Sequence, residues 1–475
     1  MTALRLEGAQ PSDQMERWPA HLVPDASRVV LQEFFASPAR TAALVDRVLA
    51  LPDADIPALL SQILAGFGAR HRDLEATLRR HGLLALHRAK QEGGDGPARC
   101  GRDRLLLLGS YFTNEYATES AALTNPSLVV HPDQTELRGG QLRVVVSLRS
   151  VGEGHVSSIS FTTAVLDPRT GAHPEPRRSP CVTAAYGTVN PRGDVRGAQV
   201  NLLPDGGAAP GLWAERPADG IPVGHVARFP ADSQLSQRVL TPFGFGESHG
   251  VEDARFVQFT DEDGTAEFRA TYTAFNGRDV APRLLRSADL ETFEVSVLTG
   301  PAAHNKGMAL FPRHIDGMQY ALCRTDGVTM GLSCSADGQH WGEPIGLHGP
   351  REDWELVQVG NCGSPMETPA GWLVLTHGVG PMRTYRLGAL LLDLHNPARV
   401  IATLPDPLLS PAPEERDGYV PNVVYSCGGL IHHGVLWLAY GMSDQRTAFA
   451  STDVRLLLEQ FRPVGRNPTA PHPPQ

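Results

Sequence analysis

The sequence predicts an all-β fold, a five-bladed β-propeller, with an α-helical N-terminal extension. From about residue 104 to 460 the chain is a succession of short apolar runs, such as LRVVVSLRS and GWLVLTHGV, divided by Gly, Pro, Asp and Asn. Regularly spaced short strands are typical of an all-β sandwich, barrel or propeller. Among these three, an internal repeat favours the propeller. The N-terminal part differs, because its apolar residues recur at helical spacing.

Two similar heptapeptides form the internal repeat. SADLETF begins at Ser287 and SADGQHW at Ser335, and both place an aromatic residue six positions after the serine. The second copy begins 48 residues after the first, which is close to the ~40–50 residues of a propeller blade. A Ser-x-Asp turn followed by an aromatic residue suits a hairpin that is pinned to the next blade. The strand-rich segment is long enough for five four-stranded blades with insertions.

Three segments before residue 90 are predicted to be helices. SPARTAALVDRVLALP opens with Ser-Pro and places Leu44, Val48 and Leu51 on one face. DADIPALLSQILAGF repeats this spacing, and RDLEATLRRHGLLALHRA continues it until Gly82 interrupts. The polar, Gly-rich stretch KQEGGDGPARCGRD then marks a domain boundary. We therefore expect three parts, a helical region over 1–100, a propeller domain over 104–460 and a disordered Pro-rich tail over 461–475.

Composition and charge narrow the class of protein. The chain has 475 residues, of which 41% are apolar and 20% charged, and its net charge is -10. No basic block favours a nucleic-acid partner, and no apolar run approaches the ~18 residues that span a membrane. The N-terminus lacks the basic and apolar regions of a secretory signal. The six cysteines are scattered without C-x-x-C spacing, so we expect reduced thiols in a cytoplasmic protein and no zinc site.

The stretch GVEDAR places three ionisable side chains at the start of an apolar run. If VEDARFVQF is a strand, its side chains alternate, so that Asp253 and Arg255 share one face and Glu252 lies on the other. One interpretation is an ion pair on the surface or between blades. The other is a carboxylate in a central funnel, beside a guanidinium that orients a ligand. The stretch alone does not decide between them.

Further polar side chains stand at the ends of other predicted strands. His377 falls where GWLVLTHGV runs out into glycine, and it is a packed histidine or a site residue. Taken one by one, the basic residues are most simply solvated charges. The basic and phenolic candidates in this part of the chain are Lys306, Arg313, Arg324, Tyr385 and Arg386.

In combination, these segments resemble glycoside hydrolase family 130, the β-mannoside phosphorylases and mannosidases. The resemblance covers roughly residues 119–450. It is carried by GVEDAR, KGMALFPR, GWLVLTHGV, YRLGALLLDLHNPARVI, VPNVVYSCG and YGMSD in the family's order, together with ESAALTNPSLVVHPDQ and SLRSVGEGHVSSI. The family's fold is a five-bladed propeller, in agreement with the strand pattern and the repeat. The N-terminal helices are not part of the shared catalytic domain.

The resemblance implies a mechanism with one catalytic acid, Asp253. Family enzymes invert the anomeric centre, and in the phosphorylases inorganic phosphate attacks the sugar while the aspartate protonates the leaving oxygen through the mannose 3-hydroxyl. Ordinary inverting hydrolysis needs two carboxylates roughly 6.5–9.5 Å apart. Phosphate is already an anionic nucleophile, so cations that hold it can replace the second carboxylate.

The resemblance also implies the residues that contact phosphate and sugar. The phosphate-binding residues are expected to be Lys306, Arg324, His377 and Tyr385. The expected substrate-binding residues are Asn125, Arg149, Glu252, Arg255, Glu367 and Asp444. No cofactor is expected beyond phosphate as co-substrate, and no metal. The extra helices could contact a neighbouring subunit in a homo-oligomer.

Two departures from the family pattern keep alternatives open. Ala254 stands where the motif has proline, and Glu367 is expected close to the anion site. The family's β-1,2-mannosidases use glutamates in place of phosphate-binding bases, so Glu367 could activate water. The sequence therefore predicts an inverting β-mannoside phosphorylase, with an inverting β-mannosidase as the alternative and a non-catalytic glycan-binding propeller as the third hypothesis. A general acid needs a raised pKa, whereas Arg255 beside Asp253 would lower the pKa of that carboxyl group.

Overall fold

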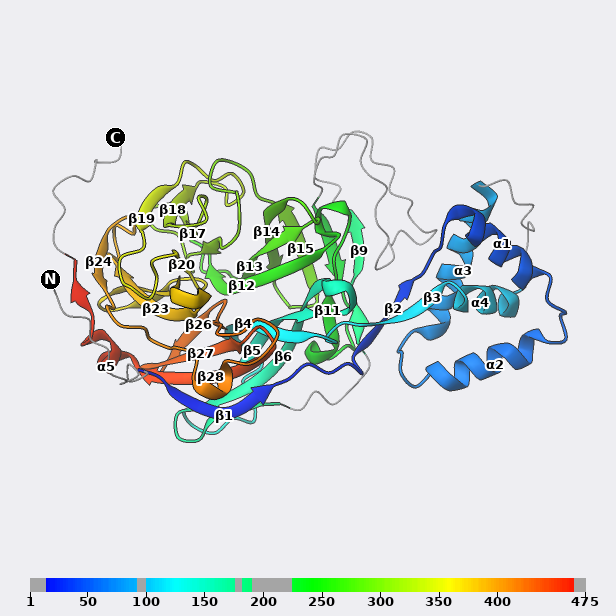
Figure 1. The fold of residues 1–475 in the computed structure, drawn as a ribbon, viewed down its shortest axis with the longest axis horizontal. Coiled ribbons are helices and arrows are strands. Elements are labelled where there is room, and N and C mark those ends of the chain that lie inside the picture. The colour runs from blue at the N-terminus through cyan, green and yellow to red at the C-terminus, as the bar shows by residue number, and fades with distance from the viewer. Residues whose placement is uncertain (1–13, 92–99, 176–181, 190–223, 465–475) are drawn as a thin grey trace.

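Antiparallel sheets built from consecutive strands make up the body of the molecule, and four helices lie to one side of it (Figure 1). The computed structural model describes residues 14–91, 100–175, 182–189 and 224–464. An all-β architecture is therefore confirmed for the greater part of the chain. No helix among the described residues is long and apolar enough to cross a membrane.

The largest sheet has twelve strands and consists of two antiparallel runs. The first run is β4 (Ala122–Val130), β5 (Leu142–Val151), β6 (Ser157–Asp167) and β7 (Gly171–Pro174). The second is β12 (Gly250–Thr260), β13 (Ala266–Phe275), β14 (Val280–Ser287) and β15 (Thr292–Val297). Short strands complete the sheet, namely β8 (Thr183–Ala184), β9 (Tyr186–Val189), β10 (His225–Arg228) and β11 (Arg238–Leu240). The two runs touch through the parallel pair Gly250 and Ser157.

Three further sheets follow along the chain. One consists of β16 (Ala309–Leu310), β17 (Gln319–Cys323), β18 (Met330–Ser335) and β19 (Ile345–His348). The next contains β20 (Gln358–Asn361), β21 (Met366–Thr368), β22 (Gly371–Val379), β23 (Tyr385–Leu392), β24 (Val400–Thr403) and β29 (Arg462–Pro463). The last contains β25 (Val424–Tyr425), β26 (Gly429–His432), β27 (Val435–Met442), β28 (Arg446–Asp453) and β1 (Glu16–Leu22). A short helix, α5 (Val454–Leu458), follows β28.

The first strands of neighbouring runs contact one another. The Ser127 hydroxyl of β4 accepts a hydrogen bond from the Phe256 amide of β12 at 3.0 Å. The amide of Cys427, just after β25, donates to the carbonyl of Pro126 in β4 at 2.8 Å. The first and last sheets are thus adjacent although they are far apart in sequence. Residues on these first strands can therefore converge on one site.

The strand β1 joins the N-terminus to the last sheet. It pairs antiparallel with β28, where Trp18 lies opposite Phe449, and Figure 1 shows it along the edge of the body. The predicted helical region 1–100 is wrong in this respect, because its first described element is a strand of the sheet body. Pairing between residues 16–22 and 447–451 is non-local, so no local pattern in the sequence reports it.

The two heptapeptides form equivalent turns. Asp289 Oδ1 accepts from two amides of the β14–β15 turn, at 2.8 Å each, and Asp337 Oδ1 does the same between β18 and β19. Phe293 and Trp341 are fully buried. Trp341 packs against Leu284 of the preceding run rather than against the next one, so the predicted hairpin is confirmed but the direction of its aromatic anchor is reversed.

The helices are α1 (Pro38–Leu49), α2 (Ile56–Phe67), α3 (Leu74–Gln91) and α4 (Arg102–Ser110), and they connect to the sheets through β2 (Val29–Glu33) and β3 (Thr113–Ala117). The predicted interruption at Gly82 is wrong, because α3 continues through it. A Cβ at Gly82 would lie 2.4 Å from the Leu105 carbonyl oxygen. The glycine therefore allows α3 and α4 to approach closely.

Both predicted domain limits shift in the structure. α4 lies beyond residue 100 and includes residue 104, where the propeller domain was expected to begin. At the other end, Arg462 and Pro463 form β29 and pair with β24, so the expected tail over 461–475 begins with ordered chain. Residues 465–475 lie outside the described residues.

Candidate active site

Two β-bulges place the polar side chains at the centre of the candidate site. The pairing of β12 with β13 shifts between Glu252 and Arg255, and that of β4 with β5 shifts between Thr124 and Ser127. Asp253 and Asn125 occupy these bulges with positive φ values of 55° and 48°. Both residue types tolerate this backbone conformation better than most. The Asn125 Nδ2 donates a hydrogen bond to Asp253 Oδ1 at 2.7 Å.

The bulge also changes which side chains share a face. Val251 packs in the same apolar cluster as Ala254 and Phe256, although strict alternation would place Val251 opposite both. Glu252 and Arg255 pair with Thr273 and Thr271 of β13, two positions apart, so they share a face. The prediction that Glu252 lies on the opposite face from Arg255 is therefore wrong. A bulge re-aims the side chain at its extra residue, and here it directs the carboxyl of Asp253 towards Asn125.

Glu252 and Asp253 share a set of cations. Arg149 donates to Glu252 Oε1 at 2.8 Å and lies 3.7 Å from Asp253 Oδ1. Lys306 donates to Glu252 Oε2 at 2.6 Å. The side chain of Glu252 is 8% exposed, whereas that of Lys306 is 39% exposed. Glu252 is thus held between two cations, and Lys306 remains accessible from solvent.

Arg255 is buried beside Asp253. Its guanidinium is 2% exposed and donates to the main-chain oxygen of Asp253 at 3.2 Å and to the Tyr425 hydroxyl at 2.8 Å. The contact of Arg255 with substrate stays a prediction. Tyr425 was not predicted as a site residue, although the segment VPNVVYSCG that contains it was noted.

The charges around the site favour the ionised form of Asp253, whereas burial disfavours the ionised form of a second acid, Asp444. Burial alone raises the pKa of Asp253, but the positive charges of Arg149 and Arg255, with Asn125 and Lys306, shift it below its usual value. Burial raises the pKa of Asp444 to about 6, assisted by the negative charge of Asp253 and opposed by Arg149. Asp444 follows β27, is half-buried and lies within electrostatic reach of the same cluster, and its contact with substrate stays a prediction.

His377, Arg324 and Tyr385 form a second group beside the first. Arg324 Nη1 donates to His377 Nε2 at 3.1 Å, and the Tyr385 ring stacks on the imidazole with centroids 6.3 Å apart. Burial, with the charges of Arg324 and Arg255, holds the pKa of His377 well below its usual value. His377 is therefore a neutral imidazole and not a cation. Its Nε2 accepts the hydrogen bond from Arg324 and so orients the guanidinium of Arg324.

Glu367 lies away from both groups, contrary to prediction. It accepts two hydrogen bonds from Arg313 at 2.9 Å each, and both side chains are exposed. Glu367 pairs across the sheet with Trp372, five residues before His377 on β22, which corresponds to roughly 17 Å along the strand. Glu367 is therefore part of an exposed ion pair and not of the candidate site.

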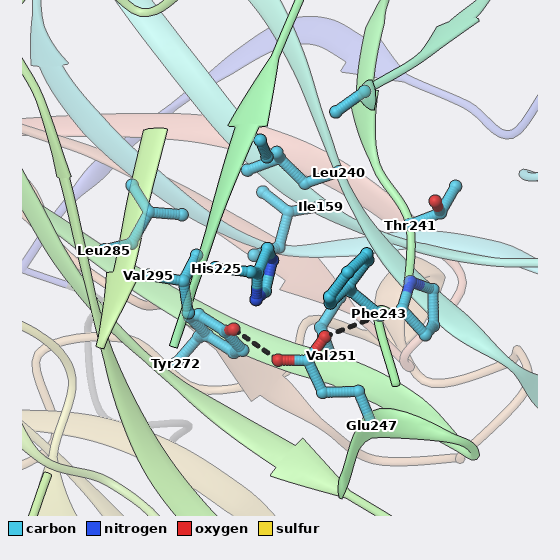
Figure 2. A pocket seen from close by; sticks show the side chains of 13 residues that line it. Ile159, His225, Leu240, Thr241, Phe243, Glu247, Val251, Tyr272, Leu285 and Val295 are labelled. Atoms are coloured by element: carbon cyan, nitrogen blue, oxygen red, sulfur yellow. Dashed lines mark hydrogen bonds between the residues drawn. The ribbon is translucent and has the colours of Figure 1, made fainter. Parts of the chain in front are cut away.

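A separate cavity lies between β10, β12 and β13 (Figure 2). Tyr272 donates to Glu247 Oε1 at 2.5 Å, the Phe243 amide donates to Oε2 at 2.7 Å, and burial raises the pKa of Glu247. The cavity volume is about 20 Å³, which accommodates about one water molecule. The cavity is too small for a sugar, and none of the predicted site residues lines it.

The arrangement has the components of acid-assisted substitution at a sugar carbon. The Asp253 carboxyl group lies beside a neutral amide donor, Asn125, and near the accessible cation Lys306. Lys306 and Arg324 provide the donors that bind oxyanions well, a point charge and a planar fork. The described residues contain no group of three or more metal-ligating side chains. The geometry thus brings the predicted site residues together, with the exception of Glu367.

Comparison with known proteins gives a consistent family. The family model described as beta-1,4-mannooligosaccharide phosphorylase matches residues 231–462. The 1,2-beta-oligomannan phosphorylase of Thermoanaerobacter sp. is 35% identical over 218 residues, 44% of this chain and 71% of its own length. The beta-1,2-mannobiose phosphorylase of Listeria innocua serovar 6a is 31% identical over 224 residues, 46% of this chain and 61% of its own length.

The solved structure of the Listeria innocua enzyme with beta-1,2-mannobiose gives a TM-score of 0.45 at 20% identity, over 72% of this chain and 92% of that one. The family assignment depends instead on the sequence relatives and on the ordered motifs that surround Asp253. Because one relative is matched at 35% identity over 71% of its length, this chain belongs to glycoside hydrolase family 130.

Proposed function

We propose that the protein is an inverting β-mannoside phosphorylase, which converts a β-mannoside and inorganic phosphate into mannose 1-phosphate and a shortened sugar. The observation that carries this proposal is an acid, Asp253, surrounded by cations. The Asp253 carboxyl accepts from Asn125 and lies 3.7 Å from Arg149, and Lys306 and half-buried Arg324 lie nearby. The names of the sequence relatives support the same activity.

We also propose that the sheets form the five blades of a β-propeller. Five antiparallel runs begin with β4, β12, β16, β20 and β25. The contacts between β4 and β12 and between β25 and β4 support a circular order. In such a ring the first strands would line a central funnel, and Asn125 and Asp253 would face it from adjacent blades.

In the proposed reaction a phosphate oxygen forms a bond to the anomeric carbon as the glycosidic C–O bond breaks. The leaving oxygen takes its proton from the mannose 3-hydroxyl, which Asp253 reprotonates. Among the cations that lower the pKa of Asp253 in the free protein, Lys306 is also proposed to bind phosphate. An anion bound to Lys306 would offset part of that shift and raise the pKa of Asp253. Phosphate binding would thus prepare the acid as well as supply the nucleophile.

The hydrolase alternative requires a base that activates water. Glu367 was its candidate, and its exposed pairing with Arg313 removes the geometric support for that role. Asp444 is the remaining half-buried carboxyl near Asp253, and its pKa of about 6 makes it partly neutral near that pH. A hydrolase would have to use Asp444, and a phosphorylase would not need it as a base.

Glu367→Gln is therefore expected to leave turnover within about twofold of wild type, because the substitution removes one partner of a surface ion pair. Initial rates with a mannooligosaccharide, with and without phosphate, provide the measurement. Loss of activity on this substitution would restore the hydrolase hypothesis in its original form.

The decisive experiment compares two incubations of the full chain with β-1,2- and β-1,4-linked mannooligosaccharides, one with inorganic phosphate and one without. Mannose 1-phosphate is expected in the first and little free mannose in either. Equal release of free mannose in both would overturn the proposal in favour of a hydrolase. Absence of any product with either linkage, together with measurable oligosaccharide binding, would favour the glycan-binding propeller.

A further inference from the structure

A second basic pocket lies outside the candidate active site, at the turn between β22 and β23. Its volume is about 210 Å³, and its polar lining includes Thr384, Arg386, Arg416 and Asn422. We call it the Arg386–Arg416 pocket. This volume exceeds the space of a single water more than tenfold. The pocket can therefore hold a ligand of several atoms.

The pocket opens on the opposite face of β23 from the active-site group. Tyr385 stacks on His377, and Leu387, of the same parity, packs in the cluster that contains Val424. Leu390, of the parity of Arg386, packs instead with Phe311 in another cluster. Adjacent side chains of a strand point to opposite faces. The strand itself therefore separates Arg386 from Tyr385 and from the proposed phosphate site.

The two guanidinium groups have no carboxylate partner among the described residues. Arg416 Nε donates to Asn422 Oδ1 at 2.7 Å, which fixes the side chain and leaves its two terminal nitrogens available. Arg386 is half-buried and makes no described hydrogen bond or ion pair. Burial lowers the pKa of Arg386, and the more distant Asp353 acts in the opposite direction. A half-buried guanidinium without a carboxylate in direct contact leaves a desolvation cost that a bound anion would offset.

The remaining polar side chains of the pocket also offer donors. Among the described residues, the Thr384 hydroxyl and the Asn422 side-chain nitrogen make no side-chain hydrogen bond. The main-chain oxygen of Asn422 accepts from the Tyr385 amide at 3.0 Å, which fixes the backbone there. Forked guanidinium donors match tetrahedral oxyanions. We propose that the Arg386–Arg416 pocket is a second anion site, which binds a phosphoryl group, either inorganic phosphate or the phosphate of a sugar phosphate.

Calorimetric titration of the full chain tests this site by binding and not by turnover. Inorganic phosphate is titrated into the Arg324→Gln variant, in which the proposed active-site anion group is impaired. Phosphate binding is expected to remain, to weaken with added sodium chloride, and to fall at least about tenfold when Arg416→Gln is added. Mannose 1-phosphate is titrated in the same way, and binding of either compound that depends on Arg416 supports the site.

Matched variants decide the result. Arg399→Gln removes an exposed arginine of the β23–β24 connection that pairs with Asp393, and it should leave phosphate binding unchanged. Arg416 is exposed, so its substitution should not disturb folding, whereas Arg386→Gln is informative only if its thermal unfolding matches wild type. Binding of both compounds that is insensitive to Arg416→Gln and to folded Arg386→Gln would overturn the site. Failure of the proposed activity would instead appear as absent turnover in the wild type, whatever the second pocket binds.

Discussion

Asp253→Asn is expected to lower the turnover of a β-mannoside by about 10²–10⁴-fold, the usual contribution of a general acid, while leaving the fold intact. Asn is the appropriate replacement because residue 253 has a φ of 55°, which asparagine adopts more readily than alanine. It is also nearly isosteric, so the contact with Asn125 can persist through the amide. Initial rates with saturating phosphate give the measurement, and circular dichroism checks the fold.

The control is Asp263→Asn, which changes a fully exposed acid of the β12–β13 turn and should leave the rate unchanged. Oligosaccharide affinity should fall much less than the rate in Asp253→Asn, because a proton donor acts mainly on the transition state. Turnover within tenfold of wild type would show that Asp253 is not the acid. If the wild type shows no turnover and the variant binds oligosaccharide equally well, a binding propeller becomes the better description.

The parts of the fold that depend on local sequence could be predicted. The Ser-Pro start of α1 and the Ser-x-Asp turns at Asp289 and Asp337 are fixed by residues within a few positions of one another. The pairing of β1 with β28 joins residues more than four hundred positions apart, and no local pattern encodes it. Gly82 was misjudged for a related reason. Its helical cost is visible locally, but the close approach to Leu105 that requires it is a tertiary contact.

The candidate site shows the same division. The motifs selected Asp253, Lys306 and Arg324 by residue type. In the structure Lys306 lies near Asp253, and Arg324 contacts His377 in the second group. The bulge at Asp253 could not be foreseen, because one extra residue in a strand leaves no mark on an alternating pattern but reverses every face beyond it. That reversal places Arg255 on the face of Glu252. Glu367 was predicted at the anion site because it is near His377 in sequence. The two residues lie towards opposite ends of β22, so the length of that strand separates them.

Glu119→Gln is expected to reduce the free energy of unfolding by about 3–5 kcal/mol, the cost of breaking a buried ion pair by removing one charge. Arg28 Nε lies 2.8 Å from Glu119 Oε1, and the two side chains are 1% and 0% exposed. Arg28 directly precedes β2 and Glu119 follows β3, where the helices join the sheets. The substitution leaves the Arg28 charge buried with weaker compensation. Urea-induced unfolding followed by tryptophan fluorescence measures the change.

Glu367→Gln provides the matched control, since it also removes the acid of an arginine pair held by bonds near 2.9 Å. There the side chains are 40% and 46% exposed, so water screens the charges and solvates Arg313 after the substitution. The expected loss is at most about 1 kcal/mol. The comparison isolates burial as the cause, because residue types and bond lengths are nearly the same. If both variants lose the same free energy of unfolding, the Arg28–Glu119 pair is hydrated in solution and does not stabilise the junction of helices and sheets.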